Sequence, residues 1–371
     1  MNRWQTCGAS VALALGLCTA SQAQILVGQT AGFSGQVAAG VKETTDGAKL
    51  FIDAVNAKGG VNGQKIELTS LDDKFDPKIA AENARKLIEE NNVVAMFLTR
   101  GTPHTESIIP LLEKHGVALV APSTGAMVLH QPVRKYIFNV RATYQREAEK
   151  AMTHLASMGI TRIAVVYADD SFGADGVTGA QKGLAAAKLT PVALEKFDRA
   201  KPDFSTTAAK IAKADTQAVL IIASGSTVVD AHAAFRAAGS AAQIVTLSNN
   251  ASGGFIKSLG ANARGVIVTQ VYPNERAVTY PMVKEAQELA KAKGLTEISP
   301  AMLEGFAAAK VLVEGLKRAG PKPSREKVHA ALEGLRKFDL GGLEVSYGPD
   351  DHTGLDFADL SIIGTDGRFR R

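Results

Sequence analysis

The segment Arg162–Ala187 reads RIAVVYADDSFGADGVTGAQKGLAAA, and it contains the unit that recurs through most of the chain. It opens with a short apolar run, Arg162–Tyr167, which predicts a buried strand. After the turn Asp169–Ser171, apolar residues at helical spacing predict a helix over Phe172–Ala187. An aspartate or serine before a helix can cap its first N–H groups, so the order strand, turn, helix is favoured.

Similar units precede and follow this segment. The predicted strands upstream are Ile25–Gln29, Lys65–Leu71, Val93–Leu98, Val117–Val120 and Tyr136–Val140, and those downstream are Pro191–Lys196, Ala218–Ala223, Ile244–Leu247 and Gly265–Val271. Helical patterns separate most of them. Strands that alternate with helices imply parallel sheets with right-handed crossovers. Entirely apolar strands, such as Val219–Ile222, indicate sheets that are covered on both faces.

The last third of the chain has a different pattern. Three helices are predicted over Thr279–Lys293, Pro300–Ala319 and Ser324–Leu335, followed by short strands near Leu343–Tyr347 and Phe357–Ile363. Two α/β series followed by helices and isolated strands suggest a chain that crosses between two lobes more than once.

Composition and charge exclude several classes of protein. The chain has 371 residues, of which 46% are hydrophobic and 21% are charged, as in a folded domain rather than a disordered chain. The formal net charge is +5, but the basic residues are spread singly along the sequence. Nucleic-acid binding needs a concentrated basic face, so a surface of mixed charges is favoured instead.

The first residues predict a secretory signal peptide, residues 1–23. Arg3 precedes an apolar run of about a dozen residues, and small residues stand before a cut after Ala23. A lipoprotein that uses Cys18 is a weaker alternative, because Leu17 stands where that processing prefers a small residue. The protein is therefore expected in the periplasm. Cys7 and Cys18 would leave with the leader, so thiolate chemistry and disulfides are not expected.

Motifs for catalysis or cofactors are not found. The sequence contains neither GxxxxGK[ST] nor a GxGxxG after a strand, and it contains neither GxSxG nor HExxH. Asp72, Asp73 and Asp76 form an acidic group, but their spacing is not that of a calcium loop. Asp76-Pro77 is better interpreted as a helix cap followed by proline at the first helical position. We therefore expect no metal, no cofactor and no enzymatic activity. A secreted enzyme using Asp72, Asp73 and Asp169 is the alternative of another class.

Loops at the predicted carboxyl ends of strands favour binding. In open parallel sheets, ligands lie outside these strand ends. The loops there are rich in hydroxyl groups and glycine: Phe33–Gly35, Thr99–Thr102, Ser123–Gly125, Ser224–Ser226 and Asn249-Asn250. Arg100 follows an apolar strand, where a guanidinium can bind a carboxylate in bidentate fashion. A solvated surface arginine is the alternative interpretation.

A series of short motifs carries a resemblance to a known family. They are Ser34-Gly35, Asn56–Gly63, Asp72–Pro77, Ala121-Pro122, Asp169–Gly173, Asp203–Ser205 and Arg236–Gly239. In this order and at these spacings, the chain resembles the periplasmic branched-chain amino-acid-binding proteins. These are the solute receptors of ABC importers with the type I periplasmic-binding fold.

The resemblance implies an α/β fold of two doubly wound lobes that are joined by three hinge crossings. Residues 24–140 with 271–345 would form the first lobe, and residues 141–270 with 346–371 the second. The crossings would fall near Phe138–Arg141, Thr269–Val271 and Val345–Tyr347. The ligand would lie between the lobes, and hinge closure would bury it.

The resemblance also implies a set of ligand-binding residues. Arg100, Ser123 and Thr124 would hold an anionic group from the first lobe, and Ser224 and Asn249 would contact the other end. The full expected set is Arg100, Gly101, Thr102, Ser123, Thr124, Gly125, Tyr144, Phe172, Ser224, Asn249, Asn250 and Tyr272. Phe33 is a further possible apolar wall.

Two departures from the family pattern affect the ligand. Arg100 stands where the family usually has a small hydroxyl residue. Ser224 and Asn249 or Asn250 stand where leucine-binding members hold the ligand's ammonium with an aromatic hydroxyl and an acid. A buried ammonium without a carboxylate partner is destabilised by several kcal/mol. The sequence therefore weakens the case for a free α-amino acid, and a small organic or aromatic carboxylate, or an amide, becomes plausible.

The sequence thus predicts a monomeric solute receptor that delivers a small ligand to the membrane permease of an ABC importer. The fold does not distinguish such a transport receptor from a periplasmic sensor subunit for an aromatic or short-chain organic acid. The identity of the ligand is not encoded in any motif that we recognise.

Overall fold

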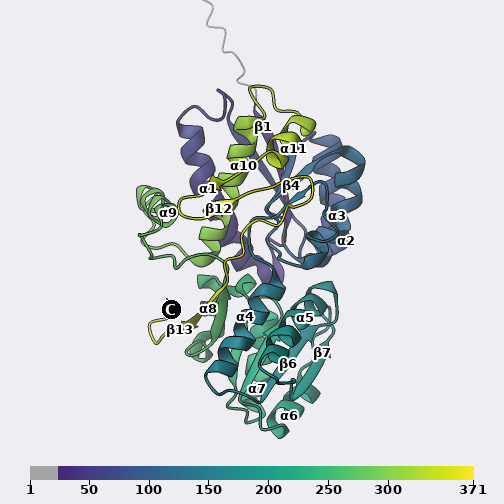
Figure 1. Ribbon diagram of the computed structural model, residues 1–371, viewed down its shortest axis with the longest axis vertical. Helices are drawn as coiled ribbons and strands as arrows, with labels where there is room; N and C mark the ends of the chain where they lie inside the picture. The colour runs from purple at the N-terminus through teal and green to yellow at the C-terminus, as the bar shows by residue number, and fades with distance from the viewer. Residues whose placement is uncertain (1–23) are drawn as a thin grey trace, which may run out of the picture.

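The computed structural model describes residues 24–371. The predicted signal peptide, residues 1–23, lies outside this range. The described chain forms two large sheets and a two-stranded ribbon, and each large sheet with the helices packed on it makes one lobe (Figure 1). The lobes are stacked along the long axis of the molecule, with the first lobe above the second in this view.

The sheet of the first lobe has five strands in the order β2-β1-β3-β4-β5, all parallel. Its strands are β1 (Ile25–Ala31), β2 (Ile66–Asp72), β3 (Ala95–Phe97), β4 (Ala118–Val120) and β5 (Ile137–Phe138). Its helices are α1 (Ala38–Ala57), α2 (Pro77–Arg85), α3 (Thr102–His115), α9 (Pro281–Ala292), α10 (Pro300–Arg318) and α11 (Arg325–Glu333). A two-stranded ribbon of β11 (Phe338–Asp339) and β12 (Glu344–Val345) completes this lobe.

The sheet of the second lobe has seven strands in the order β14-β13-β10-β9-β8-β6-β7. Five of them are mutually parallel: β6 (Ile163–Ala168), β7 (Ala193–Phe197), β8 (Ala218–Ile222), β9 (Gln243–Thr246) and β10 (Ile267–Gln270). Strand β13 (Asp359–Ile363) is antiparallel to both of its neighbours, β10 and the edge strand β14 (Phe369–Arg370). The helices are α4 (Tyr144–Ser157), α5 (Ser171–Ala186), α6 (Ser205–Lys213), α7 (Ser226–Ala237) and α8 (Gly253–Leu259).

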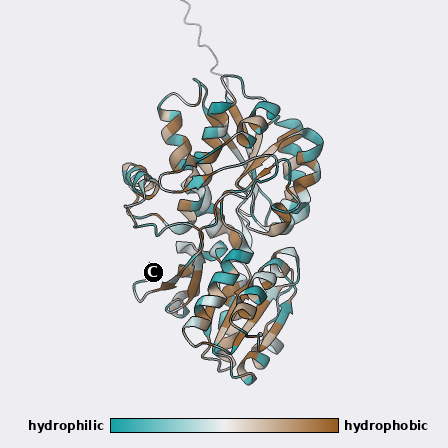
Figure 2. Cartoon of the chain, viewed as in Figure 1, coloured by the Kyte–Doolittle hydropathy of each residue, from teal (hydrophilic) through white to brown (hydrophobic). Residues whose placement is uncertain are grey.

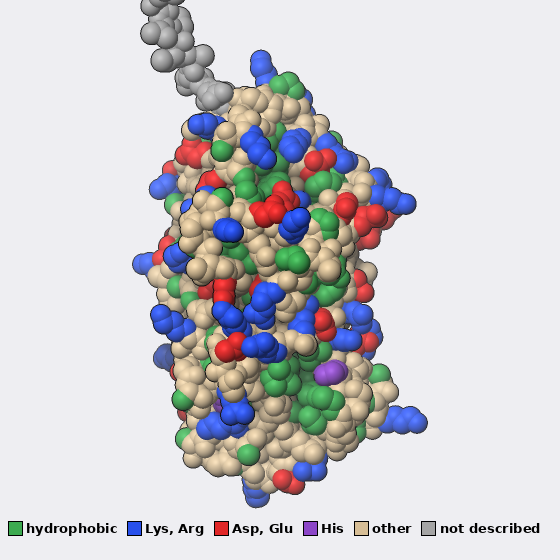
Figure 3. All heavy atoms as spheres, turned by 90° about the vertical axis from the view of Figure 1, so that its left-hand side faces the viewer, with side chains coloured by type: hydrophobic (Ala, Val, Ile, Leu, Met, Phe, Trp, Pro, Cys, Tyr) green, Lys and Arg blue, Asp and Glu red, His purple; other side chains and the backbone are tan. Residues whose placement is uncertain are grey.

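Apolar side chains are buried on both faces of each sheet. Val27 and Phe97 face one buried cluster of the first lobe, whereas Met96 and Leu119 face another. Figure 2 shows hydrophobic strands inside each lobe and hydrophilic residues on the outer faces of the helices. The predicted α/β fold of two doubly wound lobes is confirmed. Figure 3 shows basic and acidic side chains interspersed over one face of the molecule, as the sequence predicts.

Helices α1 and α10 pack unusually closely in the first lobe. Gly47 of α1 lies against the backbone of Met302, and Gly305 of α10 lies against the backbone of Thr44. A Cβ atom at either glycine would collide with a carbonyl oxygen of the other helix. The pair therefore depends on glycine at both positions, and the two helices cannot shift independently.

The chain passes between the two sheets three times. The first passage follows β5 and leads to α4, and the second follows β10 and leads toward α9. The third was expected near Val345–Tyr347, but Val345, Tyr347 and Leu355 all pack in the core of the first lobe. The Tyr347 ring lies 5.3 Å from that of Phe138, and its hydroxyl donates to the Asn139 carbonyl at 2.6 Å. The third passage therefore follows Leu355, about ten residues later than expected. We propose the lobe boundaries of the sequence analysis with this one change.

The two lobes contact each other beyond these passages. The Glu43 carboxylate of α1 accepts hydrogen bonds from the Gly253 and Gly254 N–H groups of α8, at 3.0 and 2.7 Å. Ala301 N donates to the Ala251 carbonyl at 3.0 Å. The structure therefore shows the lobes closed on each other.

Candidate functional site

The loops after β3 and β4 carry two groups of predicted site residues. Leu98 and Ala121, directly after these strands, have φ angles of 52° and 53°. Residues other than glycine rarely adopt this conformation, which costs about 1 kcal/mol or more each. The sharp turns bring Arg100 and Ser123 together as a parallel bridge, and Ser123 N donates to the Thr99 carbonyl at 2.7 Å. Backbone strain thus positions both loops at the cleft.

Arg100 reaches from the first lobe to the second. It is only 5% exposed. Its guanidinium donates to the Ser123 hydroxyl at 3.1 Å and to the backbone carbonyl of Asn249 in the second lobe. Within residues 24–371, it forms no ion pair by the 4.0 Å criterion. Burial lowers the pKa of Arg100 from its usual value, and the opposing effects of the nearby Tyr144 and Glu304 do not offset it.

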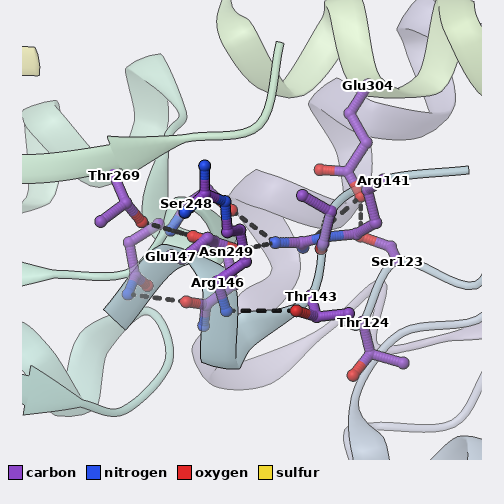
Figure 4. Close-up of polar contacts among 12 residues, drawn as sticks. Ser123, Thr124, Arg141, Thr143, Arg146, Glu147, Ser248, Asn249, Thr269 and Glu304 are labelled. Carbon is purple, nitrogen blue, oxygen red and sulfur yellow. Dashed lines mark hydrogen bonds and ion pairs between the residues drawn. The ribbon is translucent and has the colours of Figure 1, made fainter. Parts of the chain in front are cut away.

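A second arginine, Arg141, lies beside this contact in a network of charged groups (Figure 4). It pairs with Glu147 of α4 and donates to the Ser248 hydroxyl at 2.6 Å. Glu147 also accepts from Ser248 N at 2.9 Å and from the Thr269 hydroxyl. Burial alone would lower the pKa of Arg141, but the neighbouring Glu147 carboxylate raises it overall. Arg141 and Glu147 therefore form a buried ion pair between the first two passages.

Glu304 of α10 connects the two arginines. The Ser123 hydroxyl donates to its carboxylate at 2.8 Å, and the Arg141 guanidinium lies 3.8 Å from the same oxygen. Ser123 thus accepts a hydrogen bond from Arg100 and donates one to Glu304. Arg141, Glu147 and Glu304 all have partners of opposite charge in this network, whereas the hydrogen-bond partners of Arg100 are neutral.

A cavity of about 530 Å³ lies between the lobes beside Arg100. The first lobe contributes the residues around the start of α1, 35–40, together with Arg100. The second lobe contributes Gly225, Ser226, Asn249, Asn250, Ser252, Phe255 and Ser258. Across the cleft, the Thr227 hydroxyl of α7 lies 2.6 Å from the Gln36 side-chain oxygen. A small molecule in this cavity would contact both lobes.

A larger hollow of about 680 Å³ runs along α9 on the first lobe. Its lining residues fall between Glu275 and Ile298, so the second lobe does not contribute to it. A ligand there would not bridge the lobes. We therefore assign the candidate site to the cavity beside Arg100.

The two predicted asparagines of the second lobe form hydrogen bonds that stabilise its side of the cavity wall. The Asn249 amide donates to the Ser224 hydroxyl at 2.9 Å and to the Ala223 carbonyl at 3.1 Å. The Asn250 amide donates to the Ala223 carbonyl at 3.0 Å, and its oxygen accepts from Gly225 N at 2.8 Å. Both asparagines line the cavity, whereas Ser224 lies behind them as a hydrogen-bond partner.

The predicted glycine and threonine residues support the loops rather than line the cavity. The hydroxyls of Thr102 and Thr124 are hydrogen-bonded at 2.7 Å. Gly101 has a φ of 91°, and a Cβ there would lie 2.6 Å from the His104 ring. Gly125 accepts a hydrogen bond from Tyr144 N at 2.8 Å. These four residues hold the two loops in register.

The predicted aromatic residues are buried away from the cavity wall. Tyr144 and Phe172 pack edge to face, with ring centroids 4.8 Å apart. The Arg141 guanidinium lies 4.7 Å from the Tyr144 ring centroid, a cation–π contact. Tyr272 belongs to the core of the first lobe.

The aspartates of the alternative enzyme hypothesis, and the capping aspartates beside them, have structural partners. Asp72 accepts from Ser34 N and Lys74 N at 3.2 and 2.9 Å. Asp76 accepts from Lys78 N at 2.8 Å and caps α2, and Asp170 accepts from Gly173 N at 3.1 Å and caps α5. Asp73 accepts a hydrogen bond from Phe75 N at 2.9 Å and stabilises the turn between β2 and α2. Asp169 pairs with the exposed Lys196. Residues 24–371 contain no group of three or more histidines, cysteines or acids placed to bind a metal ion.

Sequence reasoning missed Arg141, Glu147 and Glu304. Glu147 lies three residues after Tyr144 and directly before Ala148, on the buried face of α4. Glu304 interrupts an otherwise apolar, buried run in α10. An acid on the inward face of a helix is the signal that would have found both residues.

Two α/β lobes that meet around one cavity define a two-lobed binding protein. The family described as "Periplasmic binding protein" matches residues 24–357, and the chain belongs to it. The family resemblance of the sequence is confirmed. Members of this family are periplasmic solute-binding proteins, a class without enzymatic activity. Within residues 24–371, none of the helices has the length and apolarity to cross a membrane.

Individual relatives cover nearly the whole chain. A "Leu/Ile/Val-binding protein BraC3" of Rhizobium johnstonii is 25% identical over 352 residues, 93% of each chain. A substrate-binding periplasmic protein of Ralstonia solanacearum is 32% identical, with a TM-score of 0.84 over 93% of this chain and 99% of that one. A possible leucine/isoleucine/valine-binding protein of Rhodopirellula baltica is 25% identical, with a TM-score of 0.87 over 95% and 98%.

Proposed function

We propose that this protein is the solute receptor of an ABC importer. It captures a small amino acid, or a related carboxylate or amide, between its lobes and delivers it to a membrane permease. The observation that carries the proposal is Arg100, a buried guanidinium without a carboxylate partner on the wall of a cavity between the lobes. A carboxylate placed there would supply the missing counter-charge.

Closure would follow from contacts to both lobes. The cavity is bounded by α1 and Arg100 on one side and by α7, Asn249 and Asn250 on the other. A ligand that contacts both walls only in the closed form stabilises that form by its differential affinity. A permease that recognises the closed surface would then distinguish the loaded receptor from the empty one.

The relatives support the same interpretation. The names of the Rhizobium and Rhodopirellula proteins refer to leucine, isoleucine and valine, which are amphipathic α-amino acids. Export by the signal peptide 1–23 and residence in the periplasm belong to the proposal, as does the absence of catalysis. The sensor alternative shares the same binding step and differs only in the partner.

A thermal-unfolding screen of amino acids, aromatic acids, short-chain acids and amides tests ligand capture. A ligand present at 100 times its Kd should stabilise the protein by about 2.7 kcal/mol. Arg100→Ala should weaken binding of a carboxylate about 100-fold, since hydrogen bonds to charged groups contribute about 1.5–3 kcal/mol. Arg162→Ala, which removes an exposed arginine on the second lobe, is the matched control. Normal carboxylate binding by Arg100→Ala would refute the site.

Delivery is tested in the producing organism. Deletion of the gene should abolish uptake of the ligand found in the screen, and the wild-type gene should restore it. The Arg100→Ala gene should not restore uptake at ligand concentrations near the wild-type Kd. Unchanged uptake after deletion would indicate a sensor or another role.

A further inference from the structure

We propose that the cavity selects a carboxylate that carries no ammonium group, rather than a zwitterionic amino acid. This inference rests on the proposed function and narrows its ligand class. It derives from the charges on and around the wall of the cavity, which can be compared group by group.

The wall of the cavity is positively charged. Among the lining residues in the described part of the chain, Arg100 alone carries a charge. The other lining side chains are glycine, serine, asparagine, glutamine and apolar groups. An ammonium group placed here would find only neutral oxygens as partners, and it would be repelled by the guanidinium.

The starts of two helices add to this positive charge. Residues 35–40 contain the start of the 20-residue helix α1, and Gly225 and Ser226 stand at the start of α7. The N-terminal end of a helix carries a partial positive charge, which remains although Ala38 N and Thr227 N donate to the Gly35 and Ser224 carbonyls. These two ends belong to different lobes and face one cavity. An anion between them would therefore favour closure, because it reduces the repulsion between the walls.

The carboxylates near the cavity are already engaged. Glu43 accepts hydrogen bonds from Gly253 N and Gly254 N and from the Ser299 hydroxyl. Glu304 is bound by Ser123, and Glu147 is bound by Arg141. Within residues 24–371, none of the three lines the cavity. None of these three acids therefore presents its carboxylate to an ammonium group placed in the cavity.

Matched pairs of ligands test the inference directly. Calorimetry compares L-leucine with 4-methylpentanoate, L-phenylalanine with 3-phenylpropanoate, and L-alanine with propanoate. We expect the carboxylate without the amino group to bind at least about tenfold more tightly in every pair that binds, since about 1.4 kcal/mol corresponds to a factor of ten. Tighter binding of the amino acids would overturn this inference and leave the proposed function intact. If no carboxylate, amino acid or amide binds at all, the proposed function itself fails.

A new acid on the wall supplies the second test. Ser226→Asp adds a carboxylate at the first position of α7, where an acid suits the helix dipole. It should weaken binding of the simple carboxylate about tenfold and reduce its preference over the amino acid. Thr178→Asp adds the same charge on the exposed face of α5 in the same lobe. An equal effect of both variants, or an unchanged preference in Ser226→Asp, would refute the charge argument.

Discussion

Arg141 and Arg100 are both buried at the boundary between the lobes, and they differ in what balances their charge. Arg141 is paired with Glu147 and also lies 3.8 Å from Glu304. Arg100 is held by the Ser123 hydroxyl and the Asn249 carbonyl, which carry no net charge. The comparison separates two uses of a buried charge. The paired arginine stabilises the passages between the lobes, whereas the unpaired one leaves binding energy available for a ligand.

Removal of the partner of Arg141 should have the largest effect on stability. Glu147→Gln leaves a buried guanidinium without its closest carboxylate, and breaking such a pair typically costs about 3–5 kcal/mol. Chemical denaturation of the purified protein would measure this as a lower free energy of unfolding. Glu149→Gln, on the same helix, removes the partner of the largely exposed Lys182 and should change stability by less than about 1 kcal/mol. Similar losses of unfolding free energy in Glu147→Gln and Glu149→Gln would show that the buried Arg141–Glu147 pair is no more important for stability than an exposed ion pair.

Asp73 provides an intermediate case, because it is a buried carboxylate with neutral donors. Thr30 Oγ1 and Phe75 N donate to it at 3.1 and 2.9 Å, and burial raises its pKa from 3.8 to about 6. Between these pH values the folded protein binds more protons than the unfolded chain. The free energy of unfolding contributed by Asp73 therefore falls as the pH rises through this window, and the loss is complete above about pH 6.

Asp73→Asn should remove this pH dependence. The amide keeps the shape of the side chain and the acceptor for Phe75 N, but it carries no charge. We expect the variant to be more stable than the wild type by about 2 kcal/mol at pH 7, with the difference vanishing near pH 4. Urea unfolding at several pH values would measure it. A difference that is constant with pH would show that the charge of Asp73 is not the cause.

Arg100 should have the smallest effect on stability. Arg100→Met removes two hydrogen bonds but also removes a buried charge that has no counter-charge, so the two contributions oppose each other. We expect the free energy of unfolding to change by less than about 1 kcal/mol, while carboxylate binding is weakened about 100-fold. Denaturation and calorimetry on the same sample would separate the two quantities. A loss comparable with that of Glu147→Gln would show that Arg100 is a structural residue.

Much of the fold could be predicted from the sequence, because each buried parallel strand corresponds to a short run of apolar residues. The run Val219–Ile222 is wholly apolar and falls within β8, which lies between β9 and β6 in the sheet. Helix α8 was not predicted, since it is seven residues long and begins with Gly253 and Gly254. The third passage was placed too early because the contact of Tyr347 with Asn139 joins residues 208 positions apart.

The site could be predicted only in part, because several of its contacts join residues that lie far apart in the sequence. The positions of Arg100, Asn249 and Asn250 follow from strand ends, and all three line the cavity. The bond between Ser123 and Glu304 joins residues 181 positions apart, so nothing in the local pattern around Ser123 indicates its acidic partner. Periodicity places Glu147 and Glu304 on buried helix faces, but it does not show which cation each one meets.

The close packing of α1 on α10 has a mechanical consequence. The start of α1 forms part of the cavity wall, and α10 carries Glu304, which is bound by Ser123 and lies near Arg141. Because Gly47 and Gly305 let the two backbones touch, one helix has little room to shift relative to the other. We therefore expect a displacement of the start of α1 to be accompanied by a displacement of α10 and of Glu304, the acid that Ser123 binds.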